Sequence, residues 1–323
     1  MGETTSILTT RDRVAHVLAR LGFRRSGWRV RPGLYKLGNP GADSPVLVSA
    51  NYKLSFDILR SRLGGLDAYI LVLDTKGINV WCAAGKGSFG TEELVSRIEQ
   101  ARLADEVQTR RLIVPQLGAT GVCAHEVHRR SGFKVRFGPV RAEDIPEFLR
   151  KGEASDEMRR VRFDMRDRAV LIPVEAKNAL PFVAGAALAA YFGDGALGSA
   201  GIAAASAAGL AGFPVLMPLL PGEDFSTKGF VLGGAVGLGA AAAALLAHDG
   251  ASFASRMVRA ASYLLALPPI TSFLALNFTG CTTFASPTGV RREMNRYIPV
   301  MAAMAGAGAS INIARRIART LKG

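Results

Sequence analysis

The sequence predicts an α/β module with a Rossmann-like, mostly parallel sheet, followed by an all-α transmembrane module of about five helices. Two observations carry this prediction. Up to about Arg168 the chain is charged, and short β-branched apolar runs alternate with helical segments, which is typical of a parallel sheet covered on both faces. Beyond that point long runs of Ala, Gly, Leu and Val are almost free of charge. We therefore expect an α/β domain over residues 1–156, a basic juxtamembrane linker over 157–170 and a transmembrane domain over 171–323.

Within the first module the apolar runs and helical spacings give an order of elements. Gly22 is a plausible stop for the first helix, Thr91 offers an N-cap for a later one, and the basic segment 24–36 is expected to be irregular or a short strand. The expected helices are 10–21, 53–63, the segment that follows Thr91, 122–130 and 143–149. The expected strands are 45–50, 68–73, 112–114 and 133–137.

In the second module five apolar spans are each close to the roughly 20 residues that a bilayer crossing requires. No acid or base lies deep within them, which counts against an ion-coupled transporter. Glycines such as Gly233, Gly234, Gly237 and Gly239 indicate close helix packing. Segment 157–168 is basic and partly apolar, and we expect a helix on the membrane surface there. The five spans are 176–192, 196–220, 229–247, 260–280 and 297–314.

The net charge of +14 could indicate a nucleic-acid partner, but the basic residues are dispersed and no interleaved basic and aromatic stripe is present. Much of the excess lies beside the apolar spans, where anionic lipid and the positive-inside rule favour it. The chain starts with a polar segment and no secretory signal. We therefore expect no nucleic-acid partner, contact with membrane lipid, a multi-pass protein of the cytoplasmic membrane and a cytoplasmic N-terminal domain.

Three cysteines, Cys82, Cys123 and Cys281, lie far apart without a C-x-x-C pair. This spacing indicates neither a disulfide framework nor a self-contained iron–sulfur site. Any electrons that the protein needs should therefore come from another protein.

The segment Asn79–Gly87 sets a thiol, an indole and an amine among residues too small to cover them. It follows the expected strand 68–73, so it should lie at the carboxyl edge of the sheet, where open α/β sheets bind ligands. Most free cysteines are simply small buried residues. Cys82 differs because Lys86 and a helix N-terminus are close, and both favour the thiolate.

Other motifs are weaker. Residues 85–90 fit G-x-G-x-x-G, but the next strand ends in Pro115-Gln116 without the acid that a dinucleotide ribose requires. His125 and His128 are spaced i, i+3, which does not match the i, i+4 spacing of a zinc helix. The D-x-H-x-x-G pattern common in cobalamin-binding proteins is absent.

The segment Asn-Val-Trp-Cys-Ala-Ala-Gly-Lys-Gly resembles the cap-helix signature of the HgcA family, the membrane-bound corrinoid proteins of microbial mercury methylation, which are related to corrinoid iron–sulfur proteins. Further similar segments are 88–94, 114–119, 125–127, 131–135, 138–142 and 277–280, so the resemblance covers most of the chain from about Pro45 onward. It implies a cobalamin-type corrinoid capped on its lower face by a short helix, with Cys82 as the cobalt ligand and catalytic residue. The implied corrinoid-binding residues are Asn79, Val80, Trp81, Cys82, Ala83, Ala84, Gly85 and Lys86.

The activity that the resemblance implies is transfer of a methyl group, as a carbanion equivalent, from a methyl-Co(III) corrinoid to Hg(II). A thiolate donor opposite the methyl group favours that mode of cleavage, and the cofactor supplies the difficult chemistry. The implied partners are a ferredoxin-like protein with two [4Fe-4S] clusters (HgcB) and a methyl-donor protein of the tetrahydrofolate pathway. Two alternatives remain open: a corrinoid methyl carrier for another acceptor in one-carbon metabolism, and a membrane transporter or sensor with a cytosolic nucleotide-binding domain.

Overall fold

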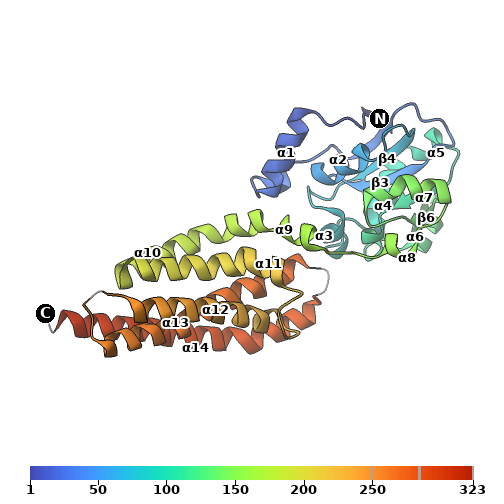
Figure 1. Ribbon diagram of the computed structural model, residues 1–323. Helices are drawn as coiled ribbons and strands as arrows, with labels where there is room; N and C mark the ends of the chain where they lie inside the picture. Colours follow the sequence, from blue (N-terminus) through green and yellow to red (C-terminus); the bar gives the residue numbers. More distant parts are fainter. Residues whose placement is uncertain (249, 283–284, 322–323) are drawn as a thin grey trace. The chain divides into compact units, whose positions relative to one another are not determined.

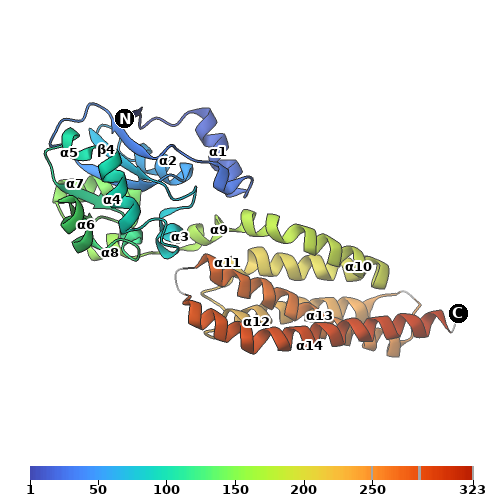
Figure 2. The same ribbon diagram turned by 180° about the vertical axis from the view of Figure 1, so that it is seen from behind.

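The computed structural model describes residues 1–248, 250–282 and 285–321 and divides the chain into two compact units, Met1–Arg162 and Phe163–Gly323. The division falls inside the expected linker 157–170. The first unit contains a sheet with helices on both faces, and the second contains long helices (Figures 1 and 2).

The sheet of the first unit has six strands in the order β1-β2-β4-β3-β5-β6, and β3, β4, β5 and β6 are mutually parallel. Strand β1 is also parallel to its neighbour β2, and the antiparallel pair in the sheet is β2 with β4. The prediction of a mostly parallel sheet is therefore confirmed. The strands are β1 (Gly2–Thr4), β2 (Gly33–Leu37), β3 (Val46–Ala50), β4 (Ala68–Leu73), β5 (Arg111–Val114) and β6 (Lys134–Phe137).

Both faces of the central strands are apolar because both are covered. Alternate residues of β3 and β4 divide between two cores: Val48 and Leu71 pack with one pair of helices, whereas Leu47 and Ile70 pack with the other. The first pair is α4 (Thr91–Gln100) and α6 (Ala124–Ser131), and the second is α2 (Lys53–Ser61) and α7 (Ile145–Lys151). The shorter helices are α3 (Val80–Gly85), α5 (Leu103–Glu106) and α8 (Asp156–Arg159).

Segment 24–36 contains a 3₁₀ turn, Arg25–Gly27, and most of strand β2, as expected of an irregular or short-strand segment, whereas β1 has no counterpart among the expected strands. Two local expectations are corrected. The N-cap of α4 is Gly90, because the hydroxyl of Thr91 accepts a hydrogen bond from the amide of Cys123 instead (2.9 Å). Segment 157–168 is not one membrane-surface helix, since α8 ends at Arg159 and α9 (Met165–Ala169) begins only after a non-helical stretch.

A buried ionic network joins helix α1 (Thr10–Arg20) to α2. The carboxylate of Asp57 accepts from Arg60 Nε (2.7 Å), and Lys53 Nζ (2.8 Å) and His16 Nε2 (2.8 Å) lie at its other oxygen. Asp12 accepts from Lys53 (2.6 Å) and from Arg60 (2.8 Å). The side chains of Asp57 and Arg60 are 1% and 7% exposed, so this network is shielded from solvent in a way that surface ion pairs are not.

Among its described residues the second unit contains four helical segments long and apolar enough to cross a membrane, so the expected count of about five is not confirmed. The first segment, Met165–Leu216, covers the expected span 176–192 and all but the last four residues of the expected span 196–220. The segments are built from α9, α10 (Ile172–Ala207), a π-helix η4 (Ala208–Gly212), α11 (Phe213–Leu216), α12 (Phe225–Leu246), α13 (Phe253–Asn277) with the 3₁₀ turn η5 (Phe278–Cys281), and α14 (Pro287–Thr320).

The first segment does not run straight. It has 52 residues, which as one straight helix would span about 78 Å, far more than the roughly 30 Å hydrocarbon core. Gly195 breaks the helix with φ +71° and ψ −158°, and the two halves of α10 run side by side on either side of this break (Figure 1).

Charged residues at the ends of three helices meet in the second unit. Asp194, beside the break in α10, accepts hydrogen bonds from Arg259 Nε of α13 (2.8 Å), from Arg315 of α14 and from the hydroxyl of Tyr263. Each of these residues lies just outside an expected span or near its end. The sequence therefore shows where each one stands along the chain, but it does not predict that they contact one another. Their pairing removes isolated charges from the bundle.

The glycines of α12 pack as expected, but on one face only. A Cβ at Gly229 would lie 2.6 Å from the Cα of Ser272, and one at Gly233 would lie 2.8 Å from the Cα of Pro268. Gly233 and Gly237 face α13, whereas Gly234 and Gly239 have open space around them. The contact between α12 and α13 therefore depends on a stripe of glycines four residues apart.

Asp12→Asn should lower the free energy of unfolding of the first unit at pH 7 by roughly 3 kcal/mol, because Arg60 and Lys53 lose a buried partner. Burial raises the pKa of the Asp12 carboxyl, but hydrogen bonds from Lys53 and Thr9 outweigh burial and hold the pKa well below its usual range. Such a group adds stability above its unfolded pKa of about 4, and this stability is lost as the pH falls below that value. The variant should therefore also show a flatter loss of stability below about pH 4.

Urea unfolding followed by tryptophan fluorescence measures this, because both tryptophans, Trp28 and Trp81, lie in the first unit. Glu147→Gln is the control, since the pKa of Glu147 is also lowered by a hydrogen bond, from Lys151, but the pair is exposed. Equal acid profiles for wild type and Asp12→Asn would contradict the role given to Asp12.

Candidate functional site

A cavity of about 310 Å³ opens at the carboxyl edge of the sheet. The chain passes from β3 to β4 on one side and then from β4 to β5 on the other, so the strand order reverses at β3, and ligands of open α/β folds bind at such a point. The walls are mostly apolar with a few polar groups, as in cofactor sites. The lining residues come from the ends of β3 and β5 (Val48, Ser49, Pro115, Leu117), from the turn after β6 (Gly138, Pro139, Val140), from α2 (Ser55, Ile58) and from the start of α3 (Asn79, Val80, Trp81).

The segment Asn79–Lys86 forms the short helix that the sequence resemblance implied. Asn79 is the N-cap, and its Oδ1 accepts the amide hydrogen of Cys82 (2.9 Å). Val80, Ala83 and Ala84 are buried, Trp81 is half-buried beside the cavity, and Cys82 is exposed with a free thiol. The thiol is therefore presented at the surface, directly after the three residues that line the cavity.

The buried side chain of Asn51 holds the loop that leads into α3. It follows β3, is 2% exposed, and its Oδ1 accepts from Thr75 N (3.1 Å), Thr75 Oγ1 (2.9 Å) and Gly77 N (2.9 Å). Its Nδ2 donates to Asp74 (3.0 Å), and Thr75 Oγ1 lies 2.6 Å from the carbonyl oxygen of Ile78. Asn51 thus fixes the position from which α3 starts, although nothing in the sequence pattern marks it.

Tight packing fixes the back of α3. A Cβ at Gly121 would lie 2.2 Å from the carbonyl oxygen of Phe89 and 3.1 Å from the Cα of Ala84. A Cβ at Gly118 would lie 2.6 Å from the ring of Phe89, which is fully buried. Only glycine fits at these two points, so the loop after β5 holds α3 from behind while Cys82 stays exposed.

The residues present fit a corrinoid. The exposed sulfur of Cys82 is a soft ligand for a transition metal, and Gly85 and Gly87 have no atoms within 4 Å of a Cβ position, so a flat ring larger than the cavity can extend over this edge. The Oε1 atom of Gln116 is buried and accepts no hydrogen bond from the described residues, and Gln116 lies between two residues that line the cavity. An unsatisfied acceptor at this place is the kind of group that a bound donor satisfies.

The other sequence candidates are not brought to this site. Gly85 lies inside α3 rather than directly after a strand, so residues 85–90 do not form the strand–loop–helix of a dinucleotide site. His125 and His128 are both exposed on α6. Among the described residues no group of three or more His, Cys, Asp or Glu is placed to hold a metal ion.

Comparison with known proteins finds one family model and several curated relatives that match part of the chain. Residues 16–149 match the model of the CO dehydrogenase/acetyl-CoA synthase delta subunit family. The chain is 33% identical over 129 residues to the acetyl-CoA decarbonylase/synthase complex subunit gamma of Methanopyrus kandleri, which covers 39% of this chain and 28% of that protein. It is 28% identical over 153 residues to the corrinoid/iron-sulfur protein large subunit of Moorella thermoacetica, which covers 45% of this chain and 34% of that protein. The chain therefore spans about a third or less of the length of these relatives.

Asn51→Ala should destabilise the first unit by about 2–3 kcal/mol, because several donors of the loop 74–77 lose their acceptor. It should also speed amide hydrogen exchange in residues 74–86 more than elsewhere in the sheet. Hydrogen exchange followed by mass spectrometry measures this in the full chain. Asn39→Ala, at an exposed asparagine of the same unit, is the control, and uniform exchange in the Asn51 variant would show that Asn51 does not hold α3.

Proposed function

We propose that the first unit binds a corrinoid at the carboxyl edge of its sheet and takes part in methyl transfer, with Cys82 as the cobalt ligand. The observation that carries this proposal is the exposed thiol of Cys82 on a capped helix whose N-cap and first two residues, Asn79 to Trp81, line an apolar cavity at the strand-order reversal. The similarity of residues 16–149 to a CO dehydrogenase/acetyl-CoA synthase subunit, and of the chain to a corrinoid/iron-sulfur protein, supports the same cofactor.

Each residue of α3 has a definite part in this proposal. Asn79 caps the helix and orients the backbone of Cys82, while Ala83 and Ala84 pack into the core and leave the opposite side of the helix for the ligand. Trp81 provides an aromatic wall of the cavity, and Gly85 and Lys86 are exposed at the end of the helix. The corrinoid supplies the transferable methyl group when it is bound. The Cys82 thiolate would hold the metal of the bound corrinoid, and its electron donation would favour departure of the methyl group with its bonding electrons.

The acceptor that we propose is Hg(II), which gives methylmercury. Mercuric ion is a soft electrophile, so it suits a methyl group delivered as a carbanion equivalent, and a thiolate ligand suits that delivery. The segment Asn79–Gly87 supports this acceptor through its resemblance to the HgcA cap helix.

A second candidate is a corrinoid methyl carrier for another acceptor in one-carbon metabolism. It is favoured by the relatives, which are named as subunits of acetyl-CoA decarbonylase/synthase complexes and of a corrinoid/iron-sulfur protein. The two candidates share the cofactor and Cys82 and differ only in the acceptor.

Reductant and methyl donor are expected to be separate proteins. The three cysteines of the chain lie far apart in the sequence, so we propose that electrons come from a ferredoxin-like protein with two [4Fe-4S] clusters, such as HgcB. A methyl-donor protein of the tetrahydrofolate pathway would supply the methyl group. The four apolar segments among the described residues support a multi-pass protein in contact with lipid. We propose that its first unit lies in the cytoplasm.

Cys82→Ala should change the absorption spectrum of the full chain reconstituted with methylcobalamin, because sulfur no longer ligates cobalt, and should reduce methylmercury formation from Hg(II) to background. Cys123→Ala is the matched control, since it removes another exposed free thiol of the same unit. A Cys82→Ala protein with the wild-type spectrum and full methyl transfer would reject the ligand role. Failure of every form to retain a corrinoid would reject the cofactor itself.

The acceptor is tested separately by comparing methyl transfer from the loaded wild-type chain to Hg(II), to a thiol and to tetrahydrofolate. Fastest transfer to Hg(II) supports mercury methylation. Transfer to an organic acceptor with none to Hg(II) supports the carrier function instead.

A further inference from the structure

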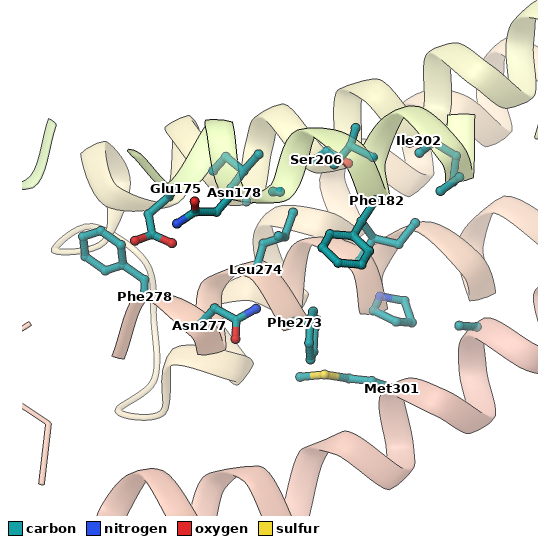
Figure 3. Close-up of a pocket in the computed structure, with 18 of the residues that line it drawn as sticks. Glu175, Asn178, Phe182, Ile202, Ser206, Phe273, Leu274, Asn277, Phe278 and Met301 are labelled. Carbon is teal, nitrogen blue, oxygen red and sulfur yellow. The ribbon is translucent and has the colours of Figure 1, made fainter. Parts of the chain in front are cut away.

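The membrane unit contains a cavity of about 910 Å³ that the proposed methyl transfer does not use. It lies among α10, η4, α13 and α14, and its walls are largely apolar (Figure 3). Its size falls within the range of small-molecule sites. The apolar residues of the walls include Phe182, Ile202, Phe273, Leu274 and Met301.

Polar groups gather toward one end of this cavity. Glu175 and Asn178 come from the first turns of α10, and Asn277 is the last residue of α13; Figure 3 shows them near one another. Cys281 donates a hydrogen bond from its thiol to Oε1 of Glu175 (3.1 Å). Among the residues that line the cavity, Glu175 is the one that carries a charge, so an anionic head group would find no cation here.

Ser206 lies farther along the cavity and gives a second, independent sign of a ligand. It is 2% exposed, and its Oγ is buried without a hydrogen-bond partner among the described residues. Figure 3 shows its hydroxyl on the cavity wall beyond Leu274. A buried hydroxyl without a partner is costly, and a ligand atom that accepts a hydrogen bond would remove that cost.

We propose that this cavity binds one uncharged lipid that carries carbonyl groups next to a hydrocarbon chain. The hydroxyl of Ser206 and the amides of Asn178 and Asn277 donate hydrogen bonds to its carbonyl oxygens, and the apolar walls take the chain. Two natural sources share this chemistry, an isoprenoid quinone and a neutral glycerol ester. The carboxylate of Glu175 selects against phospholipids with a negative head group.

The test is lipid binding to the detergent-purified full chain, measured by native mass spectrometry with menaquinone-4, dioleoylglycerol and dioleoylphosphatidylglycerol as probes. One of the two uncharged probes should bind at a single site, and the stronger of them identifies the source. Ser206→Ala should weaken that binding about fivefold, as expected for one lost hydrogen bond. Ala302→Phe, which fills the cavity from an exposed position on α14, should abolish it.

Ser226→Ala is the matched control, because Ser226 is equally buried with an unpartnered Oγ but does not line this cavity. It should bind the probe as the wild type does, and circular dichroism should show the same helix content in all variants. Preferential binding of phosphatidylglycerol, the absence of binding by either uncharged probe, or wild-type binding by both Ser206→Ala and Ala302→Phe would overturn the proposal.

Discussion

The position of the Cys82 thiol depends on the buried side-chain amide of Asn51. Asn51 sits at the end of the strand about which the strand order reverses, and its side chain satisfies the backbone of the loop 74–77. That loop leads into α3, so a polar side chain in the interior sets the position of a cysteine at the surface. A surface loop without such a partner would not hold the following helix in one orientation, because unsatisfied backbone groups favour other conformations.

Periodicity and residue size predicted much of the fold. The alternation of β-branched runs with helical segments placed β3 to β6 close to their observed bounds. Parallel strands that are covered on both faces require continuous apolar runs, and such runs are easy to recognise in a sequence. The same reasoning singled out the segment of Cys82, whose small neighbours leave it uncovered. It could not reveal β1, which has three residues and no apolar pattern. This segment is a strand because it pairs with β2 at the edge of the sheet, and its own sequence does not indicate that pairing.

Polar contacts between residues far apart in the chain could not be predicted from the sequence. Asn51 looks like an ordinary turn residue, and Thr91 like an N-cap, until the loops that contact them are known. His16 appears isolated along the chain, yet it lies beside Asp57, which is 41 positions away. The number of membrane segments was also difficult to predict. The segment Gly193-Asp194-Gly195 separates the first two expected spans, yet the helices on both sides of this break form one continuous helical segment, Met165–Leu216.

The contact between Asp194 and Arg315 has a consequence for biosynthesis. The two residues are 121 positions apart, and Arg259 is 65 positions from the same carboxylate. During translation Asp194 is therefore synthesised long before Arg259 and Arg315. Until these two residues follow, the carboxylate at the break in α10 has neither of its arginine partners. The bundle can therefore complete its packing only when α14 has been synthesised. A nascent chain that stops before Arg315 lacks one of the two arginines that pair with Asp194.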